Sequence, residues 1–161
     1  KDYTAAATDL RKAGSYLRLE AGRASGQARQ ALDSSVLEVD KLAAELAKGT
    51  VKDQQAMTRV FARADYALAL AHRSQAAASW TRKAYDQAGY QLKAAAHGLE
   101  SAAGWVGSEA KTAAAETVAE VRALGGKLAS GAKWTNAEVA RGMESLGNGI
   151  NSLGRKIEGG N

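Results

Sequence analysis

Residues 51–103 read VKDQQAMTRVFARADYALALAHRSQAAASWTRKAYDQAGYQLKAAAHGLESAA, and this stretch decides the fold. It contains no proline, and Gly89 is its single glycine before Gly98. Small and apolar residues recur every three or four positions, which is the heptad spacing of a helix that packs along a coiled-coil seam. Because this seam stays in phase throughout, it predicts one long helix lying against partner helices. The seam residues are Phe61, Ala64, Leu68, Ala71, Gln75, Ala78, Arg82, Tyr85, Gly89, Leu92, Ala96, Leu99 and Ala103.

The segments on both sides of this stretch show the same periodicity. Small and apolar residues step by threes and fours from Tyr3 to Leu46, and again from Val139 to Ile157. Short connections between such segments make neighbouring helices antiparallel. The sequence therefore predicts an all-α, elongated, antiparallel three-helix bundle that forms one domain over residues 1–161, with helices at about 2–48, 51–103 and 108–157.

Two short segments have the residues of tight turns. Gly49 suits the left-handed position after a helix, and residues 50–53 (TVKD) resemble a capping box with Asp in place of Glu. The second helix is expected to end near residues 104–107 (GWVG). Ser108 is the predicted N-cap of the third helix, and Glu109 in its first turn complements the helix dipole.

Glycine and serine positions leave a rival architecture open. Five or six shorter helices would result if the chain broke near Gly22–Gly26, Ser79–Thr81 and Gly125–Gly126. The unbroken seam of the middle segment favours three helices over this alternative. Within the third helix, the Gly125–Gly126 pair is the expected place for a kink or a break.

The composition limits the classes of protein that fit. Alanine dominates, so helices must approach closely to gain from burial, and self-association as a homo-oligomer would bury more surface. Twelve of the 17 glycines lie from Gly98 onward, which predicts that the last third is the least stable part. The chain has no cysteine, which excludes disulfides and thiolate metal sites.

No apolar run approaches the roughly 18 residues that a membrane-spanning helix needs, so no transmembrane segment is expected. The sequence starts at Lys1 rather than at methionine. Removal of a leader from an exported protein and simple trimming of the sequence both explain that start. We lean towards export, which means a periplasmic or secreted location.

Positive charge gathers in three windows without acidic residues, at 21–32, 66–85 and 121–137. In the predicted three-helix bundle these windows lie at one height, so the net charge of +5 concentrates there. The same registration puts Trp80 at the level of Gly131. We call this region the basic waist; its candidate binding residues are Arg23, Arg29, Arg73, Trp80, Arg82, Lys83, Lys127, Lys133 and Trp134.

A basic surface with indole rings is typical of a site for an anionic partner. A phosphorylated or carboxylated ligand, an anionic lipid surface and single-stranded nucleic acid all fit this chemistry, although no motif supports nucleic acid. The competing interpretation, which we favour for windows this short, is a solvated basic face with the tryptophans filling a thin core.

The last helix suggests a second function. From Gly107 onward it is amphipathic, glycine-rich and weakly hydrophobic, as are helices that bind reversibly to lipid or polymer-granule surfaces. Such a helix would leave the bundle and open it. The competing interpretation is that this segment is simply the third helix of the bundle, loosened by its glycines.

Nothing in the sequence points to catalysis, and we expect a non-enzymatic protein without a cofactor or metal. On one continuous helix, His72 and His97 would lie about 37 Å apart, too far to share a metal ion. The paired Glu-x-x-His units of di-iron bundles are missing, and so is any nucleophile motif. Binding or scaffolding is therefore the predicted role.

Overall fold

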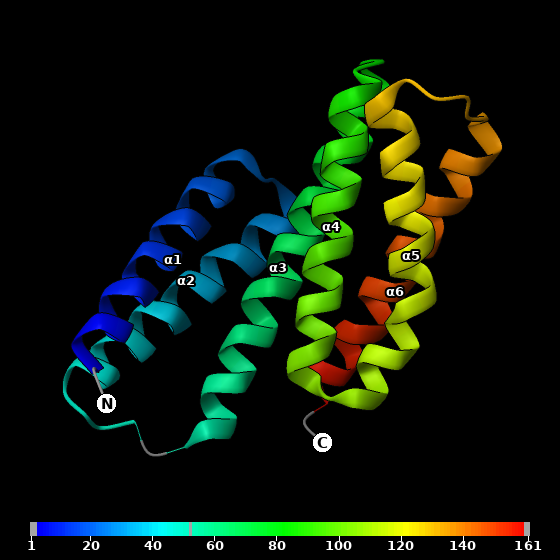
Figure 1. The fold of residues 1–161 in the computed structure, drawn as a ribbon. Coiled ribbons are helices and arrows are strands. Elements are labelled where there is room, and N and C mark those ends of the chain that lie inside the picture. Colours follow the sequence, from blue (N-terminus) through cyan, green and yellow to red (C-terminus); the bar gives the residue numbers. More distant parts are fainter. Residues whose placement is uncertain (1–2, 52, 160–161) are drawn as a thin grey trace.

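The computed structural model describes residues 3–51 and 53–159, and these fold into six α-helices without a strand (Figure 1). The all-α prediction is confirmed, but the three-helix bundle is wrong, because each predicted long helix is divided. Residues 2 and 52, which belong to predicted helices, lie outside the described residues. The helices are α1 (Tyr3–Arg23), α2 (Gly26–Ala47), α3 (Gln54–Thr81), α4 (Tyr85–Val106), α5 (Ser108–Ser130) and α6 (Asn136–Glu158).

A left-handed residue accompanies each division of the predicted helices. Gly26 (φ 55°) starts α2, Lys83 (φ 60°) separates α3 from α4, and Gly131 (φ 71°) ends α5. The first two breaks fall near the positions of the six-helix alternative. The third lies at residues 131–135, whereas α5 runs unbroken through the Gly125–Gly126 pair.

The seam of the middle segment led to the wrong prediction of one long helix. Apolar periodicity shows which face of a helix is buried, and it does not show whether the chain reverses its direction. Arg82, Lys83 and Ala84 reverse the chain between α3 and α4. The apolar spacing stays in phase across this reversal, so both arms of the hairpin present their small residues to each other. An in-phase pattern is therefore compatible with a tight helical hairpin as well as with one long helix.

The α2–α3 turn keeps one predicted feature and loses another. Gly49 is left-handed (φ 65°), as expected. The capping box at residues 50–53 is wrong, because the N-cap of α3 is Asp53, whose carboxylate accepts a hydrogen bond from the Gln55 N–H at 2.8 Å. The Thr50 hydroxyl instead donates to the Glu45 carbonyl at 3.1 Å and helps to close α2.

The α4–α5 turn lies where the sequence places it. Gly107 is the N-cap of α5 and has a positive φ of 138°, so Ser108 is the first helical residue and not the cap. Glu109 occupies the first turn, as predicted. Although the helices have between 21 and 28 residues, none in the described part is apolar enough to cross a membrane.

The helices form two groups that share α3. The α1–α2 hairpin packs on one side of α3, and α4, α5 and α6 gather on the other side (Figure 1). Helix α6 contacts α3, α4 and α5. One apolar core runs through both groups, and a smaller cluster around Ala7, Leu42 and Leu46 lies at the open end of the hairpin. Helix α3 therefore joins the two halves of the protein.

Glycines allow the close approach of α3, α4 and α5. A Cβ added to Gly98 of α4 would lie 3.0 Å from backbone atoms of Asp65 and Ala69 in α3. A Cβ on Gly89 would lie 2.6 Å from the Gly125 carbonyl oxygen in α5. Alanines fill the rest of these interfaces and are fully buried. An alanine-rich core thus gains its packing from short distances between helix axes.

Candidate functional site

Three aromatic rings meet at one end of the α3–α6 group, and we call them the aromatic cluster. Trp80 lies in the last turn of α3, Tyr85 starts α4, and Trp134 precedes α6. The ring centroids lie 5.0 Å apart for Trp80 and Trp134, 5.0 Å for Trp80 and Tyr85, and 4.8 Å for Tyr85 and Trp134. All three side chains are partly buried. Because the described chain forms six helices, these residues of the basic waist lie beside the α3–α4 and α5–α6 turns and not half-way along the helices.

Three cations without an acidic partner among the described residues adjoin the aromatic cluster along the chain. Arg82 and Lys83 follow α3, Lys133 adjoins Trp134, and all three are exposed. The Arg82 guanidinium donates a hydrogen bond of 3.4 Å to the Ser79 hydroxyl. We call these three cations and the aromatic cluster the basic end. Helix α4 begins and α5 stops at this same end of the group (Figure 1).

Three other predicted cations are paired locally. Arg23 contacts Glu20 at 3.2 Å, and Arg29 contacts Asp33 at 3.8 Å. Lys127 contacts Glu138 at 2.8 Å. The Lys127 ammonium, together with groups of Thr135, holds the pKa of the Glu138 carboxyl below its usual value. These three cations are therefore partly neutralised by carboxylates.

Arg73 lies apart from the other predicted residues, in a hollow between the start of α2, the middle of α3 and α6. This hollow has a volume of about 310 Å³ and is lined also by Ser25, Gln27, Ser74 and Met143. A Cβ added to Gly147 of α6 would lie 2.7 Å from an Arg73 guanidinium nitrogen, so this glycine makes room for the side chain. No ion pair involves Arg73 in the described part of the chain.

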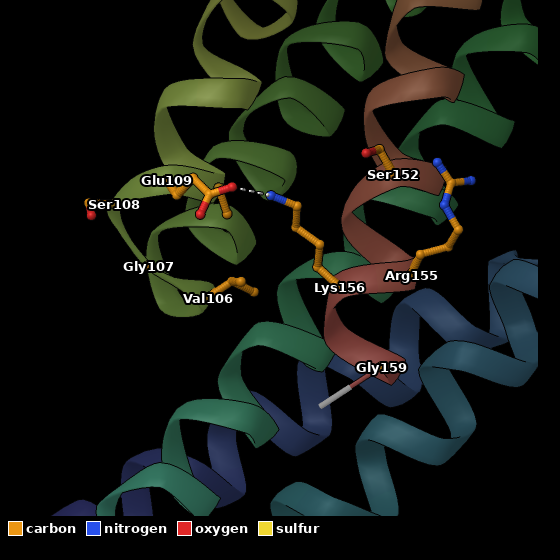
Figure 2. Close-up of a pocket in the computed structure, with 9 residues that line it drawn as sticks. Val106, Gly107, Ser108, Glu109, Ser152, Arg155, Lys156 and Gly159 are labelled. Carbon is orange, nitrogen blue, oxygen red and sulfur yellow. Dashed lines mark hydrogen bonds and ion pairs between the residues drawn. The ribbon is translucent and has the colours of Figure 1, made fainter. Parts of the chain in front are cut away.

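Another hollow lies at the opposite end, between the α4–α5 turn and the end of α6, with a volume of about 650 Å³ (Figure 2). Lys156 reaches across it to Glu109, at 3.4 Å, whereas Arg155 points to the other side of α6. The Lys156 ammonium and the Glu109 carboxylate neutralise each other. No histidine lines this hollow.

Sequence reasoning missed a third group of residues, between α1, α3 and the end of α4. The Trp105 indole N–H donates to Asp65 Oδ2 at 2.9 Å, and the Phe61 and Trp105 ring centroids lie 5.0 Å apart. Burial raises the pKa of the Asp65 carboxyl, while the Trp105 hydrogen bond and His97 act in the opposite direction. No periodicity or motif links Asp65 with Trp105, because their contact exists only in the folded chain.

The histidines lie on different helices, His72 on α3 and His97 on α4, and His72 Nδ1 is 2.8 Å from Gln91 Oε1. Within residues 3–51 and 53–159, no group of three His, Cys, Asp or Glu side chains could hold a metal ion. No protein-family model, curated protein or solved structure matches this chain. The arrangement of its own side chains must therefore support any functional proposal.

Proposed function

We propose that this chain is a non-enzymatic helical binding or scaffold module that takes an anionic partner at its basic end. One observation carries the proposal: Arg82 and Lys83 lie in the chain between the packed rings of Trp80 and Tyr85, Lys133 precedes Trp134, and none of these cations has an acidic partner in the described chain. Ammonium and guanidinium groups would supply charge, and the indoles would supply a flat apolar surface.

The spacing of the unpaired cations favours an extended anionic partner over a small ion. Arg73 lies two helical turns before Trp80 on the same face of α3, so it is about 10 Å from the basic end along the helix axis. A surface or chain that bears several phosphates or carboxylates would reach both positions. Because the cations are exposed, binding should weaken as salt concentration rises.

Replacing Arg82, Lys83 and Lys133 together with glutamine should lower the affinity for anionic vesicles about tenfold or more, since each exposed contact contributes only modestly and three are lost. Tryptophan emission during titration with phosphatidylglycerol vesicles measures this, because two of the three tryptophans lie at the site. A blue shift is expected for the unaltered protein and not for the triple variant.

A matched control removes the same charge elsewhere. Lys41, Lys48 and Lys111 are exposed and have no ion pair in the described structure, so their replacement by glutamine changes the net charge equally. This control should keep its response, and neutral phosphatidylcholine vesicles should produce none. Tripolyphosphate as a second titrant separates a soluble polyanion from a lipid surface. An equal loss in both triple variants would contradict a localised site.

A second candidate function is reversible binding to a lipid or granule surface through α6. The buried stripe of this helix contains Val139, Leu146, Ile150 and Leu153, and its opposite face is exposed. Helix α6 also carries its own capping box, in which Thr135 and Glu138 exchange hydrogen bonds of 2.7 and 3.1 Å. This local cap favours a helix that persists after leaving the bundle.

A removable cross-link distinguishes the two candidates. The hydroxyl oxygens of Thr117 in α5 and Ser145 in α6 lie 3.5 Å apart, and the chain has no cysteine of its own. The double variant Thr117→Cys, Ser145→Cys should therefore form one disulfide that holds α6 in place. Binding at the basic end predicts equal vesicle affinity for the oxidised and reduced forms. Binding that appears only after reduction would instead support the release of α6.

A further inference from the structure

An aromatic hollow of about 250 Å³ lies between α1, α3 and the end of α4. The rings of Tyr16, Phe61 and Trp105 line it, together with Leu10 and Leu68. Tyr16 and Trp105 are 47% and 43% exposed, so their rings remain open to an incoming molecule. We use the name aromatic hollow for this space.

The Asp65 carboxylate is the charged group in the aromatic hollow, and no lysine or arginine lines it. Asp65 Oδ2 accepts the Trp105 indole N–H, whereas Oδ1 accepts no hydrogen bond from the described residues. No ion pair involves Asp65 in the described chain. The hollow therefore combines aromatic surface with a partly desolvated carboxylate that no lysine or arginine pairs, and His97 on α4 is the nearby titratable group that acts on it.

We propose that the aromatic hollow binds an organic ammonium ion, with its charge against Asp65 Oδ1 and its alkyl groups against Tyr16, Phe61 and Trp105. Aromatic faces attract cations, and desolvation strengthens the attraction, as it does in aromatic cages for quaternary ammonium groups. A carboxylate beside the rings adds a direct charge pair that no neutral ligand can use. This site is separate from the basic end and has the opposite charge preference.

A second hollow extends the first and indicates the shape of the ligand. It has a volume of about 530 Å³ and shares Leu10 and Phe61 with the aromatic hollow. Leu46 and Met57 also line it, so it is suited to an aryl or alkyl group. The ligand class is thus an amine with an apolar body, whose positive end lies at Asp65.

A purely structural role for Asp65 does not explain its charge. Its hydrogen bond to Trp105 ties the end of α4 to α3, but a neutral oxygen would accept the same indole N–H. Burial of a carboxylate costs free energy that a neutral acceptor avoids. The charge therefore points to a cationic partner, and the variant Asp65→Asn separates the two roles because its amide oxygen still accepts the hydrogen bond.

Benzyltrimethylammonium is a suitable probe, with benzyl alcohol as the neutral comparison and benzoate as the anionic one. The indole N–H resonances of the three tryptophans report binding, and Trp105→Phe assigns the relevant signal. We expect a saturable shift of the Trp105 resonance with the cation, and no shift for Trp80 or Trp134. Benzyl alcohol should bind more weakly, and benzoate should not bind.

The variant Asp65→Asn should lower the affinity for the cation about tenfold and leave the response to benzyl alcohol unchanged. Phe61→Leu should weaken cation binding several-fold while preserving the apolar volume. Equal affinity for the cation and benzyl alcohol would overturn the proposal, as would unchanged cation binding in Asp65→Asn. A Trp105 shift that depends on the concentration of the protein and not on that of the cation would also overturn the proposal, because the hollow would then be a contact between two copies.

Discussion

Replacing Gly125 with alanine is expected to lower the free energy of unfolding by about 3 kcal/mol, whereas the same change at Gly126 should raise it by about 1 kcal/mol. A Cβ at Gly125 would lie 2.7 Å from the Gly89 carbonyl oxygen, and only a shift of the whole α4–α5 pair can relieve that contact. A Cβ at Gly126 meets no atom within 4 Å. It removes the conformational entropy cost of a glycine in mid-helix without creating a clash.

Urea denaturation followed by circular dichroism measures both changes, and each single variant is the control for the other. Gly89→Ala tests the same interface from α4 and should resemble Gly125→Ala, because its Cβ would lie 2.6 Å from the Gly125 carbonyl oxygen. Similar midpoints for the Gly125 and Gly126 variants would show that α4 and α5 do not approach as closely as described.

The second large effect is expected at Glu20, whose replacement by alanine should cost about 3 kcal/mol. Glu20 is only 3% exposed, and it accepts hydrogen bonds from Gln75 at 3.0 Å and Arg23 at 3.2 Å. The Gln75 contact attaches the end of α1 to the C-terminal part of α3, whereas Arg23 lies on α1 itself. Alanine would leave the partly buried Gln75 amide without its acceptor, whereas the exposed Arg23 guanidinium can turn to water.

A second substitution tests this mechanism. The double variant Glu20→Leu, Gln75→Leu replaces the buried polar pair with an apolar pair. Much of the stability that Glu20→Ala loses should then return. Glu116→Ala is the control, because this exposed carboxylate on α5 has no ion pair in the described structure, and its loss should change stability by less than about 0.5 kcal/mol. A Glu20→Ala variant as stable as this control would refute the proposed attachment.

The helical class and two of the turns could be predicted because they depend on local signals. Apolar spacing reveals the buried faces, and Gly49 and Gly107 mark places where the backbone takes a positive φ. Lys83 gave no such signal, since a lysine in the left-handed region is uncommon, and the nearby residues Ser79–Thr81 only left a break open as the alternative. The Gly125–Gly126 pair misled for a different reason: Gly125 serves close packing within a continuous helix.

The candidate site was predictable only in part, for a similar reason. Trp80 and Trp134 could be assigned to one level because the turn near residues 104–107, which the sequence places correctly, sets the register of the segments on both of its sides. The pairs Arg23–Glu20 and Arg29–Asp33 have local i, i+3 and i, i+4 spacings within one helix. The Lys127–Glu138 pair could not be foreseen, since it joins α5 to the cap of α6. The aromatic hollow depends on Asp65 meeting Trp105, which requires the α3–α4 reversal that the seam conceals.

The shared position of α3 has a consequence for synthesis on the ribosome. Most packing joins helices that are consecutive along the chain, as α1 with α2, α2 with α3, α3 with α4 and α4 with α5. Each emerging helix therefore finds its first partner already made, and closure of long loops is rarely needed. The chain has no proline, so slow prolyl isomerisation plays no part in its folding. Until α4 leaves the exit tunnel, the apolar face of α3 that α4 will cover stays exposed. At this stage the nascent chain is most prone to aggregate with other chains.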